Sequence, residues 1–218
     1  MTREIVIDVG GRSGEVEGLL QIPPRASHLL VFAHGAGAGM RHAFMESAAA
    51  ALGVQGIATL RYQFPYVQKK LGRPDPPAVL HATVRAAVRE AAAAARDLPL
   101  LAGGKSMGGR MTSQAAADQP LEGVRRLVFF GFPLHAAGSP SSERGAHLSR
   151  VTVPMLFLQG TRDKLAELEL LRPLLAAIPR ATLKVFEGGD HMFHFPKSAG
   201  RTEDVFSEIA RTIADWTD

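Results

Sequence analysis

Leu100-Leu-Ala-Gly-Gly-Lys-Ser-Met-Gly-Gly109 is the stretch that indicates the fold, because it sets a serine in a sharp turn after an apolar strand. It contains Gly104-Lys105-Ser106-Met107-Gly108, a Gly-x-Ser-x-Gly pattern, and a helical pattern follows. Glycine two residues before and two after the serine removes Cβ atoms that would collide in so tight a turn. The pattern predicts a nucleophile elbow, with Ser106 at the carboxyl edge of a sheet and beside a helix N-terminus.

The segments on either side alternate between strand and helix patterns. Residues 4–9 and 15–22 alternate polar and apolar around Gly10-Gly11 and predict an antiparallel hairpin. Further strands are expected at 29–33, 56–60, 100–102, 127–130, 155–158 and 183–186, with helices at 43–52, 79–95, 106–117, 166–178 and 203–216. This order predicts one α/β domain over residues 1–218, a mostly parallel twisted sheet with helices on both faces.

Two nucleotide-binding patterns compete for the glycine-rich turns, and both fail on spacing. A phosphate-binding loop ending in Gly104-Lys105-Ser106 needs glycine at position 99, where Pro99 stands. A dinucleotide-binding turn built on Gly35 and Gly37 needs glycine at position 40, which is methionine, and lacks an acidic ribose partner after the next strand. We therefore expect no nucleotide cofactor.

Composition excludes several other classes of protein. The 218 residues hold 25 Lys and Arg against 21 Asp and Glu, so the net charge is 25 − 21 = +4, and no basic run predicts nucleic-acid binding. Cysteine is absent, which excludes disulfides, zinc–thiolate sites and a cysteine nucleophile. The N-terminal segment lacks a signal-peptide pattern, and no uncharged apolar stretch approaches about 18 residues. A soluble, cytoplasmic protein without a membrane partner is expected.

Two residues further along the chain are candidates for activating Ser106. Each comes after a predicted strand, and the chain order is serine, acid, histidine. Asp163 comes just after the strand at 155–158, and His191 lies in the loop after the strand at 183–186. A serine hydroxyl needs a base, and the base needs an orienting acid. The carboxyl ends of parallel strands share one edge, so all three should meet there. Asp163 as a helix cap and Asp190 as the acid are weaker interpretations, and His194 is expected to be packed or supporting.

The turn after the strand at 29–33, His34-Gly35-Ala36-Gly37, is the candidate for half of an oxyanion hole. Such a hole needs two backbone N–H groups aimed at the developing negative oxygen. One is expected from Met107 and the other from Ala36, with Gly35 or Gly37 as alternatives. His34 is expected to shape this turn.

The motifs together carry a family resemblance: Ala33-His34-Gly35-Ala36-Gly37, Gly104 to Gly109, Gln159-Gly160-Thr161-Arg162-Asp163 and Gly188-Gly189-Asp190-His191. The set resembles the α/β-hydrolase superfamily, above all a small branch of predicted hydrolases similar to dienelactone hydrolases and NSL-complex subunit proteins. The resemblance implies Ser106 as nucleophile, Asp163 as acid and His191 as base, with no metal or organic cofactor. Some members of that branch act as scaffolds, so a non-catalytic binding protein is the alternative.

The leading hypothesis is a carboxylesterase that acts on small soluble esters through an acyl-enzyme on Ser106. Between Phe132 and Val153 there are 153 − 132 = 21 residues, mostly small and polar, which is too few for a large apolar lid. An open cleft is expected, with that segment at most a flap, and with Arg61, Tyr62 and Arg162 nearby. Short acyl chains of about two to six carbons should be favoured, because each further methylene gains only where an apolar wall buries it.

Overall fold

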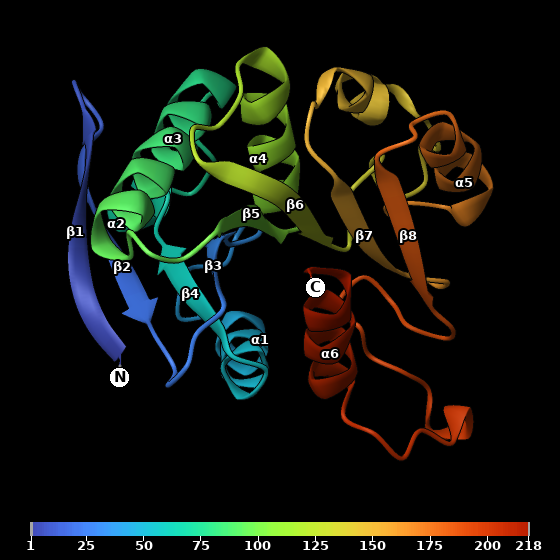
Figure 1. The fold of residues 1–218 in the computed structure, drawn as a ribbon. Helices are drawn as coiled ribbons and strands as arrows, with labels where there is room; N and C mark the ends of the chain where they lie inside the picture. Colours follow the sequence, from blue (N-terminus) through green and yellow to red (C-terminus); the bar gives the residue numbers. More distant parts are fainter. Residues whose placement is uncertain (1, 218) are drawn as a thin grey trace.

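A mixed sheet forms the centre of the protein in the computed structural model, which describes residues 2–217 (Figure 1). Its strand order is β1-β2-β4-β3-β5-β6-β7-β8. The strands are β1 (Thr2–Gly10), β2 (Gly14–Gln21), β3 (His28–Ala33), β4 (Ile57–Tyr62), β5 (Leu100–Lys105), β6 (Val124–Phe130), β7 (Met155–Gly160) and β8 (Ala181–Phe186). β1 and β2 form the expected antiparallel hairpin, β2 runs antiparallel to β4, and β3 to β8 pair in parallel. The predicted fold class is confirmed.

Helices cover both faces of the sheet (Figure 1). They are α1 (Ala43–Val54), α2 (Pro65–Gln68), α3 (Pro77–Ala94), α4 (Met107–Asp118), α5 (Leu168–Ala176) and α6 (Val205–Thr217), with 3₁₀ turns η1 (Glu143–Arg150) and η2 (Lys197–Ala199). α1 and α6 lie together on one face, whereas α3, α4 and α5 lie on the other. The short helix α2 carries too few residues for a periodic pattern and was not expected from the sequence.

Two apolar cores follow from the alternation of side chains along the strands. In β6, Leu127 and Phe129 face the core under α3, α4 and α5, whereas Val128 and Phe130 face the core under α1 and α6. Every residue of β3 after its first is buried, so the central strands read as continuous apolar runs rather than as alternating ones.

β5 is longer than expected, reaching Lys105 instead of residue 102. Glycines weaken an isolated strand, and the predicted strand stops before Gly103 and Gly104. Here the neighbouring strands impose the extended form and require the glycines. A Cβ on Gly103 would lie 1.8 Å from the carbonyl oxygen of Val128 on β6. The extra length carries the chain directly into Ser106.

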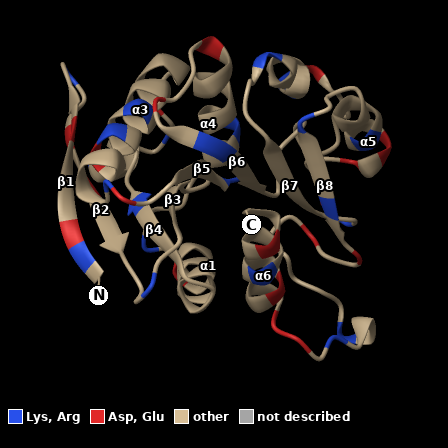
Figure 2. Cartoon of the chain, in the orientation of Figure 1, with Lys and Arg blue, Asp and Glu red and all other residues tan. Residues whose placement is uncertain are grey.

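Charges of both signs are spread over the surface (Figure 2). β1 and α6 each carry acidic and basic residues, as expected for a net charge of +4. Within residues 2–217, none of the helices combines the length and the apolar character needed to cross a bilayer.

The parallel strands bring their carboxyl ends to one edge of the sheet. Ala33 at the end of β3 is in register with Gly104 on β5, and Lys105 is in register with Phe130 on β6. Gly160 ends β7 opposite Phe186 at the end of β8. The loops that follow these strands are therefore the ones that meet at this edge, where ligands of open α/β sheets bind.

Candidate active site

Ser106 occupies a strained turn between β5 and α4. Its backbone angles are φ 51° and ψ −119°, a conformation that is costly for a residue with a side chain. Its N–H donates to the carbonyl of Phe130 at 3.1 Å, which fixes the turn to β6. A Cβ on Gly104 would lie 2.4 Å from the carbonyl oxygen of Ala33, and one on Gly108 would lie 2.5 Å from that of His34. Both glycines flanking the serine are thus sterically required, as the pattern predicts.

The imidazole of His191 links Ser106 to Asp163. Its Nε2 lies 2.9 Å from the Ser106 hydroxyl oxygen, and its Nδ1 lies 2.7 Å from Oδ2 of Asp163. An ionised carboxylate only accepts hydrogen bonds, so Nδ1 carries the proton and Nε2 is left to accept from the serine. The three residues proposed from chain order are brought together in one continuous chain of hydrogen bonds.

Asp163 is held in place by more than the histidine. Its side chain is fully buried, Oδ2 also accepts from Nε2 of Gln159 at 2.5 Å, and Oδ1 accepts from the backbone N–H of Leu165 at 2.8 Å. Helix α5 begins at Leu168 with Glu167 as its N-cap, so Asp163 does not cap it. Three donors converge on this carboxylate and hold it in one orientation toward His191.

Gln159 supports the carboxylate of Asp163, a role that was not predicted from the sequence. Its Oε1 accepts from the N–H of Phe132, and its Nε2 donates to Asp163, so it ties β7 to the loop after β6. It is completely buried. The available signal was a glutamine at the end of an otherwise apolar strand, four residues before the aspartate.

Hydrogen bonds to the side chain of Asp190 stabilise the loop that carries His191. One oxygen of this carboxylate accepts the backbone N–H groups of Met192 at 2.8 Å and His194 at 2.9 Å. Phe193 adopts φ 60° and is buried between aromatic rings. The centroid of its ring lies 5.3 Å from the ring centroid of Phe186. Asp190 therefore shapes the loop and does not touch the imidazole of His191. The expectation that His194 is packed is wrong, since 78% of its side chain is exposed.

The glycine-rich turn after β3 is organised by His34, as expected. The buried ring donates from Nδ1 to the carbonyl of Gly35 at 2.8 Å and accepts at Nε2 from the N–H of Phe64 at 3.2 Å. Burial lowers the pKa of His34 to about 4, so the ring is neutral and keeps this pair of bonds at physiological pH. The turn lies against the elbow, since a Cβ on Gly35 would be 3.6 Å from that of Ser106.

Both expected oxyanion donors flank the serine. Met107 is the first residue of α4, and the early N–H groups of a helix lack intrahelical partners. Ala36 is in the turn after β3 and lines the same cavity as Ser106. This cavity has a volume of about 320 Å³. Its lining residues are Gly35, Ala36, Gly37, Ala38, His42, Phe44, Met45, Lys105, Ser106, Leu165, His191 and Met192.

A wider hollow of about 660 Å³ adjoins this cavity through Leu165, His191 and Met192. Arg162 and Lys164 line it, so the expectation that Arg162 lies near the cleft agrees with its position. The same expectation is wrong for Arg61 and Tyr62. The guanidinium of Arg61 is buried and donates to the carbonyl of Met40, and Tyr62 is completely buried in the core.

The segment between β6 and β7 does not form a flap over the cavity. Leu134 and Leu148 are fully buried, and the N–H of His135 donates to the carbonyl of Leu165 at 2.9 Å. On η1, Nε2 of His147 lies 2.7 Å from the hydroxyl of Ser113 on α4. These contacts pack the segment against α4 and against the loop that follows β7, and the described residues that line the cavity all come from other segments.

Fold and site together define an α/β-hydrolase architecture, and comparison with known proteins agrees. The family model for the alpha/beta hydrolase domain matches residues 26–218, so the chain belongs to that family. It is 28% identical over 209 residues to the "Putative phosphoribosyl transferase" of Mycobacterium tuberculosis. That alignment covers 92% of this chain but 43% of the relative, so the chain spans less than half the length of the curated relatives it matches.

Solved structures of hydrolases share the fold at low sequence identity. A dienelactone hydrolase from Anabaena variabilis superimposes with a TM-score of 0.76 at 22% identity, covering 99% of this chain and 96% of the other. An α/β serine hydrolase homologue from Coxiella burnetii gives 0.77 at 22% identity, covering 99% and 97%. A serine hydrolase without a lid from Xanthomonas campestris gives 0.69 at 23%, covering 88% and 87%. The resemblance seen in the sequence motifs is confirmed at the level of the superfamily, and the protein has a hydrolase fold.

Proposed function

We propose that this protein is a serine hydrolase, specifically a carboxylesterase that cleaves small esters through an acyl-enzyme on Ser106. The observation that carries the proposal is the unbroken hydrogen-bond chain from Ser106 through His191 to the buried Asp163, with Ser106 on a strained elbow that lines a cavity. Such a chain supplies the base that a serine hydroxyl needs and holds the base in the required tautomer.

The reaction proceeds in two halves. As the Ser106 oxygen attacks the ester carbonyl, its proton passes to Nε2 of His191, and the N–H groups of Met107 and Ala36 stabilise the negative oxygen. The alcohol departs with that proton, leaving an acyl group on Ser106. Water then attacks the acyl-enzyme, again giving its proton to His191, and the carboxylic acid leaves as the serine is reprotonated. Asp163 holds the imidazole in place throughout and stabilises the imidazolium.

The cavity supports a preference for small acyl groups. Its walls near the serine are the side chains of Phe44, Met45, Leu165 and Met192, which offer apolar contact. Its volume of about 320 Å³ falls at the small end of the range for ligand pockets. An acyl chain gains about 0.8 kcal/mol per buried methylene only until it reaches the open side of the cleft.

A fluorophosphonate probe tests whether Ser106 is activated. The wild type should be labelled and should hydrolyse p-nitrophenyl acetate, whereas Ser106→Ala should do neither while keeping its fold. A folded wild type that is never labelled and never hydrolyses a panel of esters would refute the enzyme and favour a binding or scaffold role.

Two neighbouring aspartates provide a matched test of the acid. Asp163→Asn should lower kcat/KM by several orders of magnitude, because the amide no longer selects the tautomer of His191 that accepts from Ser106. Asp190→Asn should lower it far less, since this residue shapes the loop and its Oδ1 is replaced by an amide oxygen. The reverse order of effects would show that the acid is Asp190.

A further inference from the structure

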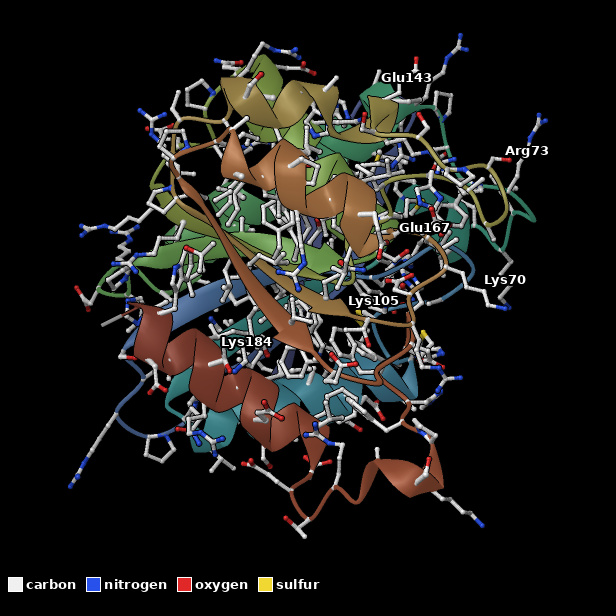
Figure 3. The ribbon with its side chains drawn as sticks, turned by 90° about the vertical axis from the view of Figure 1, so that its right-hand side faces the viewer. Lys70, Arg73, Lys105, Glu143, Glu167 and Lys184 are labelled. Carbon is white, nitrogen blue, oxygen red and sulfur yellow. The ribbon has the colours of Figure 1, made fainter. Side chains whose placement is uncertain are left out.

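Lys105 is a buried cation directly beside the candidate nucleophile. Only 4% of its surface is exposed, and its side chain lies at the carboxyl end of β5 inside the molecule (Figure 3). Other lysines behave differently: Figure 3 shows Lys70 reaching away from the body of the protein, while Lys184 on β8 is almost half exposed. An ammonium group is costly to remove from water, so its position in the interior needs a compensating contact.

The compensating contact is a hydrogen bond to the backbone of His191. Nζ of Lys105 donates to the carbonyl oxygen of His191 at 2.7 Å, across 86 residues of sequence. The ring of Phe44 lies 5.4 Å from the same nitrogen and gives a cation–π contact. Gly131, at the end of β6 with φ +66°, leaves the room that this arrangement needs. A Cβ there would lie 3.0 Å from Nζ and 3.3 Å from Nδ1 of His191.

Burying the charged amino group of Lys105 lowers the stability of the folded protein. Burial lowers the pKa of Lys105 to about 7, although the carboxylates of Asp163 and Asp190 act in the opposite direction. Neither carboxylate forms an ion pair with it among residues 2–217. A methionine has similar length and would fill the same apolar space without a desolvation cost. The amino group of Lys105, which donates to the carbonyl of His191, therefore serves a purpose other than filling the core.

We propose that Lys105 is a positioning residue that clamps the His191 loop to the elbow and so sets the distance between base and nucleophile. The inference rests on the proposed function. The loop is well organised internally by Asp190, but within residues 2–217 the hydrogen bonds and ion pair of that carboxylate are all made to groups in its own turn. Lys105 joins the loop to β5 one residue before Ser106, so a single side chain fixes both partners of the proton transfer. Loss of the clamp lets the imidazole drift, and small misplacements of catalytic groups slow reactions strongly.

The first experiment compares Lys105→Met with the matched variant Lys184→Met. Lys105→Met should fold normally and lower kcat for p-nitrophenyl acetate by roughly 10- to 100-fold with little change in KM, because the clamp acts on the base and not on the substrate. Lys184→Met should match the wild type. Wild-type kcat in a folded Lys105→Met variant would overturn the proposal.

A second substrate separates positioning from direct binding. The same fall in kcat is expected for an ester whose acyl chain ends in a carboxylate. A defect confined to that anionic ester, seen as a raised KM, would mean that Lys105 binds substrate charge, and the positioning role would be wrong.

Chemical restoration of the cation gives a third readout, because the chain contains no cysteine. Lys105→Cys should be as slow as Lys105→Met, and alkylation with 2-bromoethylammonium should bring kcat back to within a few-fold of the wild type. The wild type treated with the same reagent controls for damage elsewhere, and intact mass establishes one addition per chain. Full alkylation of a folded protein without recovery would refute the clamp. A wild type that is inactive and unlabelled by fluorophosphonate would instead refute the proposed function itself.

Discussion

Replacing Lys105 with methionine is expected to make the protein more stable near neutral pH, and this gain should disappear as the pH rises. The reason is that the pKa of this lysine differs between the folded and the unfolded protein. Its pKa falls from the ordinary 10.5 to about 7 in the folded protein, because burial removes the ammonium from water. Below pH 7 the folded state carries the full cost of a buried charge, and above pH 10.5 neither state is charged.

The size of the effect follows from the shift. A difference of 10.5 − 7 = 3.5 pKa units corresponds to about 5 kcal/mol of destabilisation below pH 7. Between pH 7 and pH 10 the unfolded chain holds one more proton than the folded protein, so the stability of the wild type rises relative to Lys105→Met, by about 3 to 4 kcal/mol in all. Leaving the carbonyl of His191 without its donor costs the variant about 1–3 kcal/mol at every pH. The variant should therefore be more stable at pH 6 by about 2–4 kcal/mol and no more stable at pH 10.

Urea unfolding of the wild type, Lys105→Met and Lys184→Met at pH 6 to 10 measures this directly. Lys184 is half exposed, so its replacement should give a difference in unfolding free energy that hardly changes over this range. A difference between wild type and Lys105→Met that is equally flat would refute the reasoning, because it would mean that the ammonium is as well solvated in the fold as in the unfolded chain.

Three further outcomes are expected. Gly108→Ala should prevent folding or destabilise the protein by several kcal/mol, since its Cβ would lie 2.5 Å from the backbone oxygen of His34, whereas Gly72→Ala meets no atom within 4 Å and should be neutral in thermal denaturation. The ring protons of His34 should titrate near pH 4 by NMR, and the native state should lose stability as the pH falls from 6.5 to about 4, because the unfolded chain binds that proton first; a midpoint near 6.5 would contradict its burial. Across p-nitrophenyl esters, kcat/KM should peak between about two and six carbons, and a maximum beyond about ten would reveal an apolar tunnel.

Much of the site could be predicted from the sequence because its requirements are local. The turn at Ser106 requires the glycines around it. Each motif also follows an apolar strand that can be recognised from its own residues. Parallel strands share one carboxyl edge, so chain order was enough to bring Asp163 and His191 to Ser106. The antiparallel hairpin at the N-terminus could be predicted for the same reason.

By contrast, the direction and surroundings of individual side chains were decided only by tertiary packing. Arg61 and Tyr62 follow the predicted strand at 56–60, as cleft residues would. In the structure β4 continues to Tyr62 between β2 and β3, and the two side chains are buried there. The roles of Gln159 and Lys105 could not be predicted from their motifs, because the groups they bind, the N–H of Phe132 and the carbonyl of His191, come from other loops. The order of motifs along the chain thus determined which residues meet. The hydrogen bond from Lys105 to His191, and the burial that lowers the pKa of Lys105, exist only once segments distant in the sequence pack together and exclude water.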